Sequence, residues 1–143
     1  MPMGKILCAT RGGEASFRAQ DRAISLAKER GDELIFLYVV DLAFLDKKAA
    51  LVINIKESMD KMGEFLLIMA QERAEAQGVQ ARALLREGKV RQEIKAAASE
   101  ESVALVVLGR PVREDGSRIF ALEDLQNFAA ELEAETGAEV VIV

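Results

Sequence analysis

Short apolar runs alternate along this chain with stretches whose hydrophobic residues recur at helical spacing. The runs occupy residues 6–9, 34–40, 103–108 and 138–143, and their length and β-branched content are typical of strands. The run at 34–40 is continuous, as expected of a strand that is covered on both faces. Residues 79–85 alternate between apolar and polar only in part, which predicts an edge strand with one face nearer water.

Four segments between these strands carry hydrophobic residues three and four positions apart, which predicts helices. Their stripes are Ala15, Ala19, Ala23 and Ala27; Met59, Met62, Leu66 and Met69; Val90, Ile94, Ala97 and Ala98; and Leu122, Leu125, Ala129 and Leu132. Gly31, Gly78 and Gly137 are expected to end three of these helices. Residues 41–55 show no clean period. The methionines of the second stripe are expected in the core rather than on a binding face.

The order of elements is therefore β-α-β-α-β-α-β-α-β, without a Gly/Ser-rich linker or an internal repeat. Such alternation produces right-handed crossovers and a parallel sheet with helices on both faces. We predict an α/β protein with a single domain over residues 1–143, built as a doubly wound open sheet.

Composition excludes several classes of protein. The chain has 143 residues and a net charge of −5, which provides no general attraction to nucleic acid. It has no histidine, which rules out Ser-His-Asp catalysis and ordinary zinc sites, and no metal ligands are predicted. Cys8 is the only cysteine and lies in an apolar run, so an inert, buried thiol is expected. No segment has the length of a signal peptide or a membrane span, so we expect a cytoplasmic protein.

Ligands of doubly wound sheets bind beyond the carboxyl ends of the strands. The segments that should reach this edge are Thr10 to Gly13, Asp41 onward, Arg86 to Lys89 and Gly109 to Arg118. None of them contains G-x-G-x-x-G, and Walker A fails because Gly88-Lys89 is followed by Val90 and position 83 is alanine. The pair Gly12-Gly13 could approach an anion at a helix start, or form a tight turn only.

Arginines gather on the same predicted loops, at positions 11, 110, 113 and 118. One interpretation is an anion-binding cluster, because guanidinium groups match phosphate and carboxylate. The other is a solvated loop in which Glu114 and Asp115 neutralise the arginines. Asp41, which follows a strand, could likewise contact a ribose or a metal, or be a turn residue.

Several segments resemble the universal stress protein family. The opening Gly4-Lys5-Ile6-Leu7-Cys8-Ala9-Thr10-Arg11-Gly12-Gly13-Glu14-Ala15-Ser16 is similar to the family's K-I-L-V-P-V-D-G-S-E-x-S. Gly31-Asp32-Glu33-Leu34 with Val39-Val40-Asp41, Arg86 to Lys89 with Ile94, and Val106 to Gly109 resemble later motifs in the right order. The resemblance implies a five-stranded sheet in the order 3-2-1-4-5 and a homodimer through the last strand, Ala138 to Val143.

The nucleotide-binding members of that family carry an Asp after the first strand and a G-x2-G-x9-G-[S/T] loop after the fourth. Here Arg11 stands in place of the Asp, and Gly109 matches only the first glycine of the loop. Val112 and Leu122 occupy the places of the other two glycines, and Pro111 removes an N–H group from the loop. The resemblance is thus to members that do not bind ATP.

We therefore expect a non-catalytic, cytoplasmic homodimer with a role in stress response or regulation, with protein partners and without a cofactor. The alternative is a protein that binds ATP, another adenine nucleotide or an anion through an altered loop. A third hypothesis, an enzyme of related α/β type, has no base, nucleophile or metal constellation to support it. The candidate ligand site comprises Thr10, Arg11, Gly12, Gly13, Val40, Asp41, Gly88, Gly109, Arg110, Gly116 and Ser117.

Overall fold

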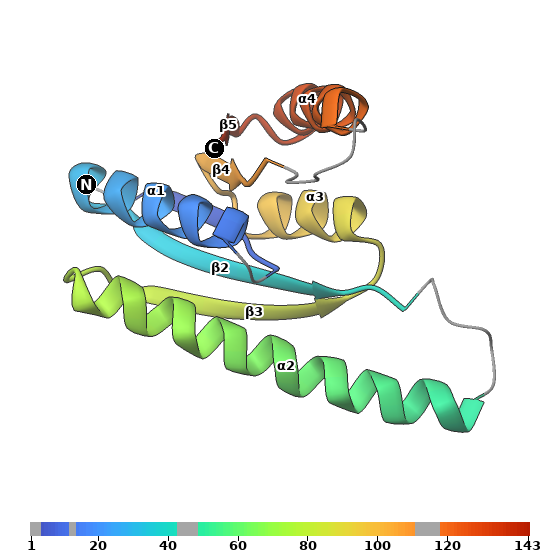
Figure 1. Cartoon of the computed structure of the whole chain (residues 1–143). Helices are drawn as coiled ribbons and strands as arrows, with labels where there is room; N and C mark the ends of the chain where they lie inside the picture. Colours follow the sequence, from blue (N-terminus) through green and yellow to red (C-terminus); the bar gives the residue numbers. More distant parts are fainter. Residues whose placement is uncertain (1–3, 12–13, 43–48, 111–117) are drawn as a thin grey trace.

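Five parallel strands form one sheet in the order β3-β2-β1-β4-β5 (Figure 1). The computed structural model describes residues 4–11, 14–42, 49–110 and 118–143. The strands are β1 (Lys5–Ala9), β2 (Glu33–Val40), β3 (Ala81–Glu87), β4 (Leu105–Leu108) and β5 (Glu139–Ile142). The helices between them are α1 (Glu14–Arg30), α2 (Ala49–Ala76), α3 (Val90–Glu100) and α4 (Arg118–Thr136). The predicted α/β class and strand order are confirmed.

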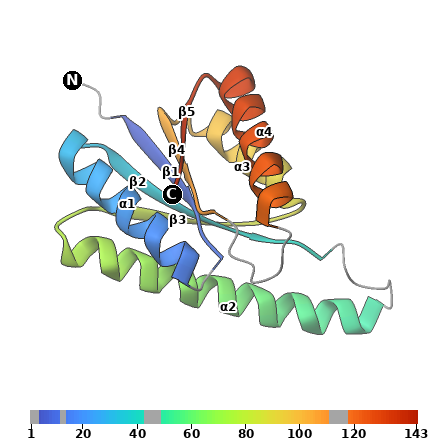
Figure 2. The same cartoon turned by 45° about the horizontal axis from the view of Figure 1, so that its top comes forward.

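Two hydrophobic clusters lie on opposite faces of the sheet. The first joins α1 and α2 to alternate residues of the central strands, including Ile6, Cys8 and Phe36. The second joins α3 and α4 to the residues in between, including Leu7 and Ile35. Figure 2 shows the two pairs of helices on either side of the strands. Because both faces of β1 and β2 are covered, these strands consist of continuous apolar runs.

Two strands start two residues later than their apolar runs predict, for the same physical reason. Val79 closes the end of α2: its N–H donates to the Ala74 carbonyl (3.0 Å) after Gly78, which has a φ of 76°. Val103 closes α3 in the same way, with its N–H donating to the Ala98 carbonyl (3.1 Å). In such helix ends, the apolar residue after the left-handed position packs back on the helix. Both valines are buried, but as helix stops rather than as strand residues.

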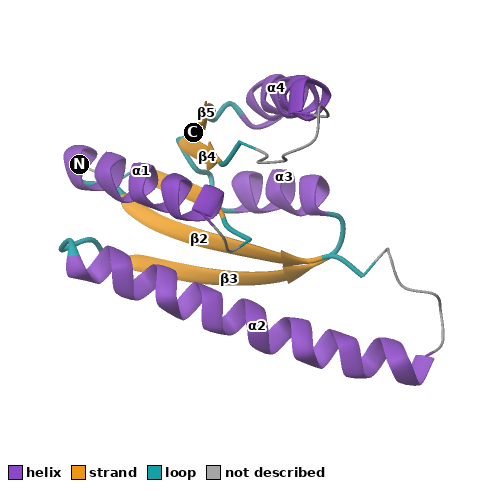
Figure 3. Cartoon of the chain, in the orientation of Figure 1, coloured by secondary structure: helices purple, strands orange, loops and turns teal. Residues whose placement is uncertain are grey.

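Two helices begin earlier than their stripes predict. α2 starts at Ala49, within the stretch that showed no period, and Figure 3 shows it as the long helix that runs along β3. α4 starts at Arg118, so the prediction that residue 118 lies on a loop is wrong. Within the described ranges, no helix is both long and apolar enough to cross a membrane.

The expectation that the methionines of α2 belong to the core is wrong for Met62 and Met69, whereas Met59 packs against the first cluster. Met62 is 58% exposed and Met69 is 37% exposed, while Met59 is half-buried. The side of α2 that faces the sheet instead carries Gly63, Leu67, Ala70 and Ala74, all buried. Small residues on that side let the helix lie close to the strands, which turns the larger side chains outward.

Candidate functional site

Parallel strands bring the predicted site residues to one edge of the sheet. Thr10 and Arg11 follow β1, Val40 ends β2 and is followed by Asp41, Gly88 follows β3, and Gly109 and Arg110 follow β4. These positions thus share the carboxyl edge, as the sequence predicted. Gly12, Gly13, Gly116 and Ser117, together with Pro111 to Asp115, lie outside the described residues.

A buried polar pair lies beneath this edge. Thr10 is 2% exposed, and its hydroxyl oxygen accepts a hydrogen bond of 2.8 Å from the side-chain amide of Gln20 on α1. The other amide atom of that side chain, Oε1, is buried without a partner among the described residues. Sequence reasoning missed Gln20 and its neighbour Ser16, although each directly follows an alanine of the α1 stripe and the two keep the same spacing of four residues that leads to the buried Ile24. That spacing was the signal that they face the sheet.

Four backbone amides at the edge already donate hydrogen bonds within the protein. They are Thr10 to the Leu37 carbonyl (2.9 Å), Gly88 to the Val40 carbonyl (3.0 Å), Arg110 to the Val143 carbonyl (3.0 Å) and Arg11 to the Ser16 hydroxyl (3.0 Å). Phosphate cradles consist of amides that point at the ligand. These four amides are therefore engaged in holding strand ends and a helix start together.

The arginines of the edge fall into two groups. Arg11 and Arg110 are exposed, and neither has an ion-pair partner in the part of the chain that the structure describes. Arg86, near the end of β3, instead bonds Glu93 (2.8 Å) and Glu100 (2.6 Å) of α3. These two carboxylates raise the pKa of the Arg86 guanidinium, with Glu100 contributing most. Arg86 is thus a structural clamp, whereas Arg11 and Arg110 are accessible cations.

The backbone conformation at residue 88 explains why this position is a glycine. Its φ is 151°, and a Cβ atom there would lie 2.7 Å from Oε2 of Glu93. Glycine is therefore needed where the chain turns from β3 into α3. The turn therefore explains why a glycine stands at residue 88, and no phosphate-binding role is needed to explain it.

The thiol of Cys8 is fully buried in the middle of β1. Loss of solvent raises its pKa to about 12, so the reactive thiolate is not formed near neutral pH. The predicted burial of Cys8 is confirmed. Within the described ranges, no three His, Cys, Asp or Glu side chains are placed to hold a metal ion.

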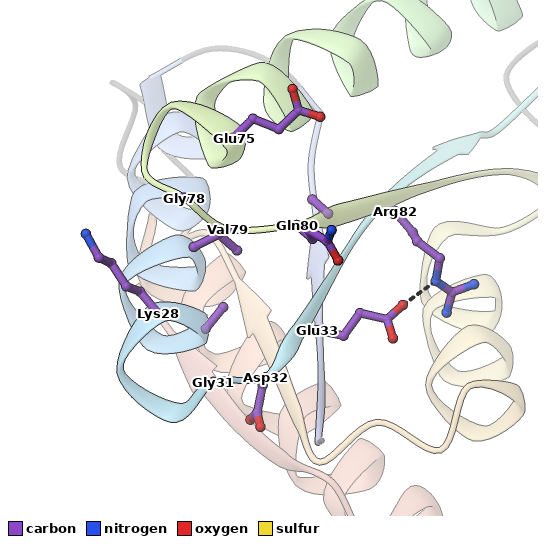
Figure 4. A pocket seen from close by; sticks show the side chains of 11 residues that line it. Lys28, Gly31, Asp32, Glu33, Glu75, Gly78, Val79, Gln80 and Arg82 are labelled. Atoms are coloured by element: carbon purple, nitrogen blue, oxygen red, sulfur yellow. Dashed lines mark hydrogen bonds and ion pairs between the residues drawn. The ribbon is translucent and has the colours of Figure 1, made fainter. Parts of the chain in front are cut away.

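A hollow of about 680 Å³ lies at the opposite, amino edge of the sheet (Figure 4). It is formed where α1 turns into β2 and α2 turns into β3, between Asp32, Glu33 and Arg82 among others. Arg82 pairs with Glu33 there, and Asp32 pairs with Arg30 (3.0 Å). Lys28 and Glu75 also line the hollow and form no ion pair in the described part of the chain. None of the predicted site residues lines it.

Comparison with known proteins agrees with these features. The sequence model of the universal stress protein family matches residues 3–127. Universal stress protein YxiE of Bacillus subtilis (strain 168) is 33% identical over 114 residues, which cover 73% of this chain and 77% of YxiE.

Solved structures share the fold. Universal stress protein UspA from Lactobacillus plantarum superposes with a TM-score of 0.83 at 16% identity, over 100% of this chain and 99% of that one. A universal stress family protein from Burkholderia pseudomallei has a TM-score of 0.76 at 24% identity, over 98% and 95% of the two chains. Because its sequence matches the family model and YxiE, and its strands follow the expected order, the chain belongs to the universal stress protein family.

Proposed function

We propose that this universal stress protein is a non-catalytic, cytoplasmic homodimer that acts in stress response through protein partners and does not hold ATP in the family's usual way. The proposal that ATP is not bound in the usual way rests on one observation: backbone amides at the carboxyl edge of the sheet already donate hydrogen bonds within the protein. The N–H of Arg110, which follows the Gly109 of the family's loop, donates to the Val143 carbonyl at 3.0 Å. An amide turned toward the C-terminal strand does not point at a phosphate.

The test is calorimetric titration of the protein with magnesium-ATP, ADP, AMP and cyclic AMP, combined with thermal shift. We expect no heat and no shift with millimolar ATP. Protein purified from its own host should likewise carry no nucleotide by ultraviolet absorbance and mass spectrometry. Saturable ATP binding would contradict the proposal.

An altered anion site is the second candidate function, and the two accessible arginines favour it. The register pairs Cys8 of β1 with Val107 of β4, so Arg11 and Arg110 stand at equivalent places beyond two neighbouring strands. Adenine nucleotides are also found in structural neighbours. One universal stress protein was solved in complex with cAMP (TM-score 0.69, 23% identity), and one from Arabidopsis thaliana with AMP bound (TM-score 0.66, 14% identity).

Arginine variants separate the two candidates. If an anion binds here, Arg11→Ala and Arg110→Ala should each weaken binding of AMP or cyclic AMP by about tenfold or more, the value of a charge-assisted contact. Arg22→Ala is the matched control, because Arg22 is an exposed arginine of α1 outside the edge. Equal binding by all three variants would contradict the altered site.

The proposed dimer rests on the open edge of β5. The amide of Glu139 donates to the carbonyl of Ala104, just before β4, and the amide of Val143 donates to the carbonyl of Leu108. The alternation of strand hydrogen bonds therefore turns the amide of Ile142 outward. The carboxylate of Glu133 already accepts from the amide of Val140 (3.0 Å), so pairing would centre nearer Ile142. Exposed strand edges invite pairing with another chain.

Sedimentation of the protein and of Ile142→Pro tests this interface. Proline removes the outward amide while leaving the β4 side of the strand intact. We expect a dimer for the wild type and a loss of this contact in the variant. Val143→Ala, which keeps all amides, serves as the control.

A further inference from the structure

The outward side of α2 carries an apolar patch with no covering element in the described part of the chain. Phe65 is 61% exposed, Met62 58%, Ile68 53% and Met69 37%. The patch continues on α1, where Phe17 is 36% exposed and lies 4.6 Å below the guanidinium of Arg73. Single exposed apolar residues are ordinary, but a contiguous group marks an interaction surface.

The row of α2 residues that faces away from the sheet carries opposite charges at its two ends. Lys61, Phe65, Ile68 and Glu72 follow one another at spacings of four, three and four, which places them on one stripe of the helix. A cation thus stands at one end, an anion at the other, and two large apolar side chains lie between them. All four are exposed.

The two charged ends have no partners in the described part of the chain. Neither Lys61 nor Glu72 forms an ion pair there, whereas their helix neighbours do. Lys56 pairs with Asp60 (2.8 Å), and Arg73 pairs with Asp21 of α1. The charges at the ends of the stripe are therefore available to another molecule.

A stripe of this kind is complementary to itself when two copies run antiparallel. With a two-fold axis between Phe65 and Ile68, Phe65 of each copy faces Ile68 of the other, and Lys61 of each faces Glu72 of the other. Two-fold contacts are reciprocal in this way, so one pattern supplies two ion pairs and two apolar contacts. A parallel arrangement would instead oppose lysine to lysine and glutamate to glutamate.

We propose that this face of α2 binds a second copy of the same chain through an antiparallel α2–α2 contact. Large side chains have about 150–250 Å² to bury. With the fractions given above, the five side chains offer roughly 370–610 Å², which is in the range of the largest patch on a typical monomer. That is about half or more of the ~800 Å² that one partner contributes to a standard interface.

This contact is distinct from the β5 edge. α2 lies along β3, where Gln71 donates to the Ala81 carbonyl (3.0 Å), and β3 and β5 are the opposite ends of the sheet (Figure 1). The β5 contact makes the dimer of the proposed function, and the α2 contact joins such dimers into larger assemblies as the protein concentration rises. The α2 contact can therefore be tested whether or not the β5 contact forms.

The test uses charge reversal at the ends of the stripe, with sedimentation velocity over a dilution series. Lys61→Glu and Glu72→Lys should each weaken the association by about tenfold, because each places two like-charge pairs in every contact. The double variant Lys61→Glu/Glu72→Lys should regain wild-type association. An equimolar mixture of the two single variants should do the same, because the copy with two glutamates then meets the copy with two lysines.

Phe65→Gln tests the apolar centre and should abolish the contact. Glu64→Gln is the matched control, since Glu64 is exposed on α2 beside the stripe. The far-ultraviolet circular dichroism spectra of all variants should equal that of the wild type, which separates lost association from lost folding. Unchanged self-association of Phe65→Gln and Lys61→Glu, or no recovery when the two charge-reversal variants are mixed, would overturn the proposal. These results are the ones expected if the face binds a different protein instead of a second copy.

Discussion

Gly63 of α2 lies against the ring of Tyr38 on β2. A Cβ atom at residue 63 would stand 2.6 Å from Cδ1 of Tyr38 and 2.8 Å from Cδ1 of Leu85 on β3. Real Cβ atoms do not approach so closely, so the absence of a side chain at this position sets the distance between helix and sheet. The close approach of α2 thus depends on a residue that would ordinarily weaken a helix.

We expect Gly63→Ala to destabilise the protein by about 1–2 kcal/mol. Overpacking in a well-filled core costs about 1–3 kcal/mol, which the gain in helix propensity of up to ~1 kcal/mol offsets only in part. Urea unfolding measures the difference. Ser58→Ala, at an exposed position of the same helix, should be neutral or slightly stabilising, and a stabilising Gly63→Ala would show that α2 can move away from the sheet freely.

The buried bond between Thr10 and Gln20 provides a second prediction. Thr10→Val keeps the shape of the side chain but leaves the Gln20 amide without its acceptor, which should cost about 1–3 kcal/mol. Removing both polar groups in Thr10→Val/Gln20→Leu should cost less than the sum of the two single changes. A double-mutant cycle on unfolding free energies measures the coupling, and strict additivity would mean that the bond contributes nothing.

The thiol of Cys8 should resist modification in the folded protein. Because it is buried and its pKa is raised to about 12, a disulfide reagent should react at neutral pH only through unfolding. The labelling rate is therefore expected to rise with urea in step with the loss of structure. Unfolded protein, which exposes the same thiol, is the control. Rapid labelling under native conditions would point to local opening of β1.

Arg86 should control part of the acid sensitivity of the protein. Its hydrogen bond and charge lower the pKa of the Glu100 carboxyl from its usual 4.5 in the folded state. The unfolded chain thus takes up this proton first as the pH falls below 4.5. The stabilisation is full above that pH and is lost as the pH falls through the lower, folded-state pKa.

The variant Arg86→Met should therefore lose less stability than the wild type between neutral pH and roughly pH 3. Urea unfolding at each pH measures the change. Arg22→Met, which replaces an exposed arginine without an ion pair in the described residues, should keep the wild-type pH dependence. If both variants follow the same pH profile, the clamp between β3 and α3 does not stabilise the fold.

Hydrophobic periodicity alone determined the class of this protein and the order of its elements. Runs such as 34–40 indicate strands by their length and β-branched content, and a sheet covered on both faces can bury side chains that point to either side. The same order brings Thr10, Gly88 and Gly109 to one edge, since parallel strands all end there. The absence of histidine and of intact phosphate motifs likewise required no structure.

The tertiary structure decided what periodicity cannot. Val79 and Val103 are apolar whether they start a strand or close a helix, and only the hydrogen bonds to Ala74 and Ala98 distinguish the two. Whether an amide at the edge points at a ligand or at a neighbouring strand, as for Arg110, is also a property of packing.

The clearest case is α2, where a hydrophobic stripe gave no indication of which side faces the sheet. Met62, Met69 and Phe65 are apolar and regularly spaced, but they lie outward because the side of α2 that faces the sheet is taken by Gly63, Leu67, Ala70 and Ala74. Periodicity was enough to predict that α2 is a helix with apolar residues. Steric fit against Tyr38 and Leu85, which is known only once the chain has folded, decided which of them remain at the surface.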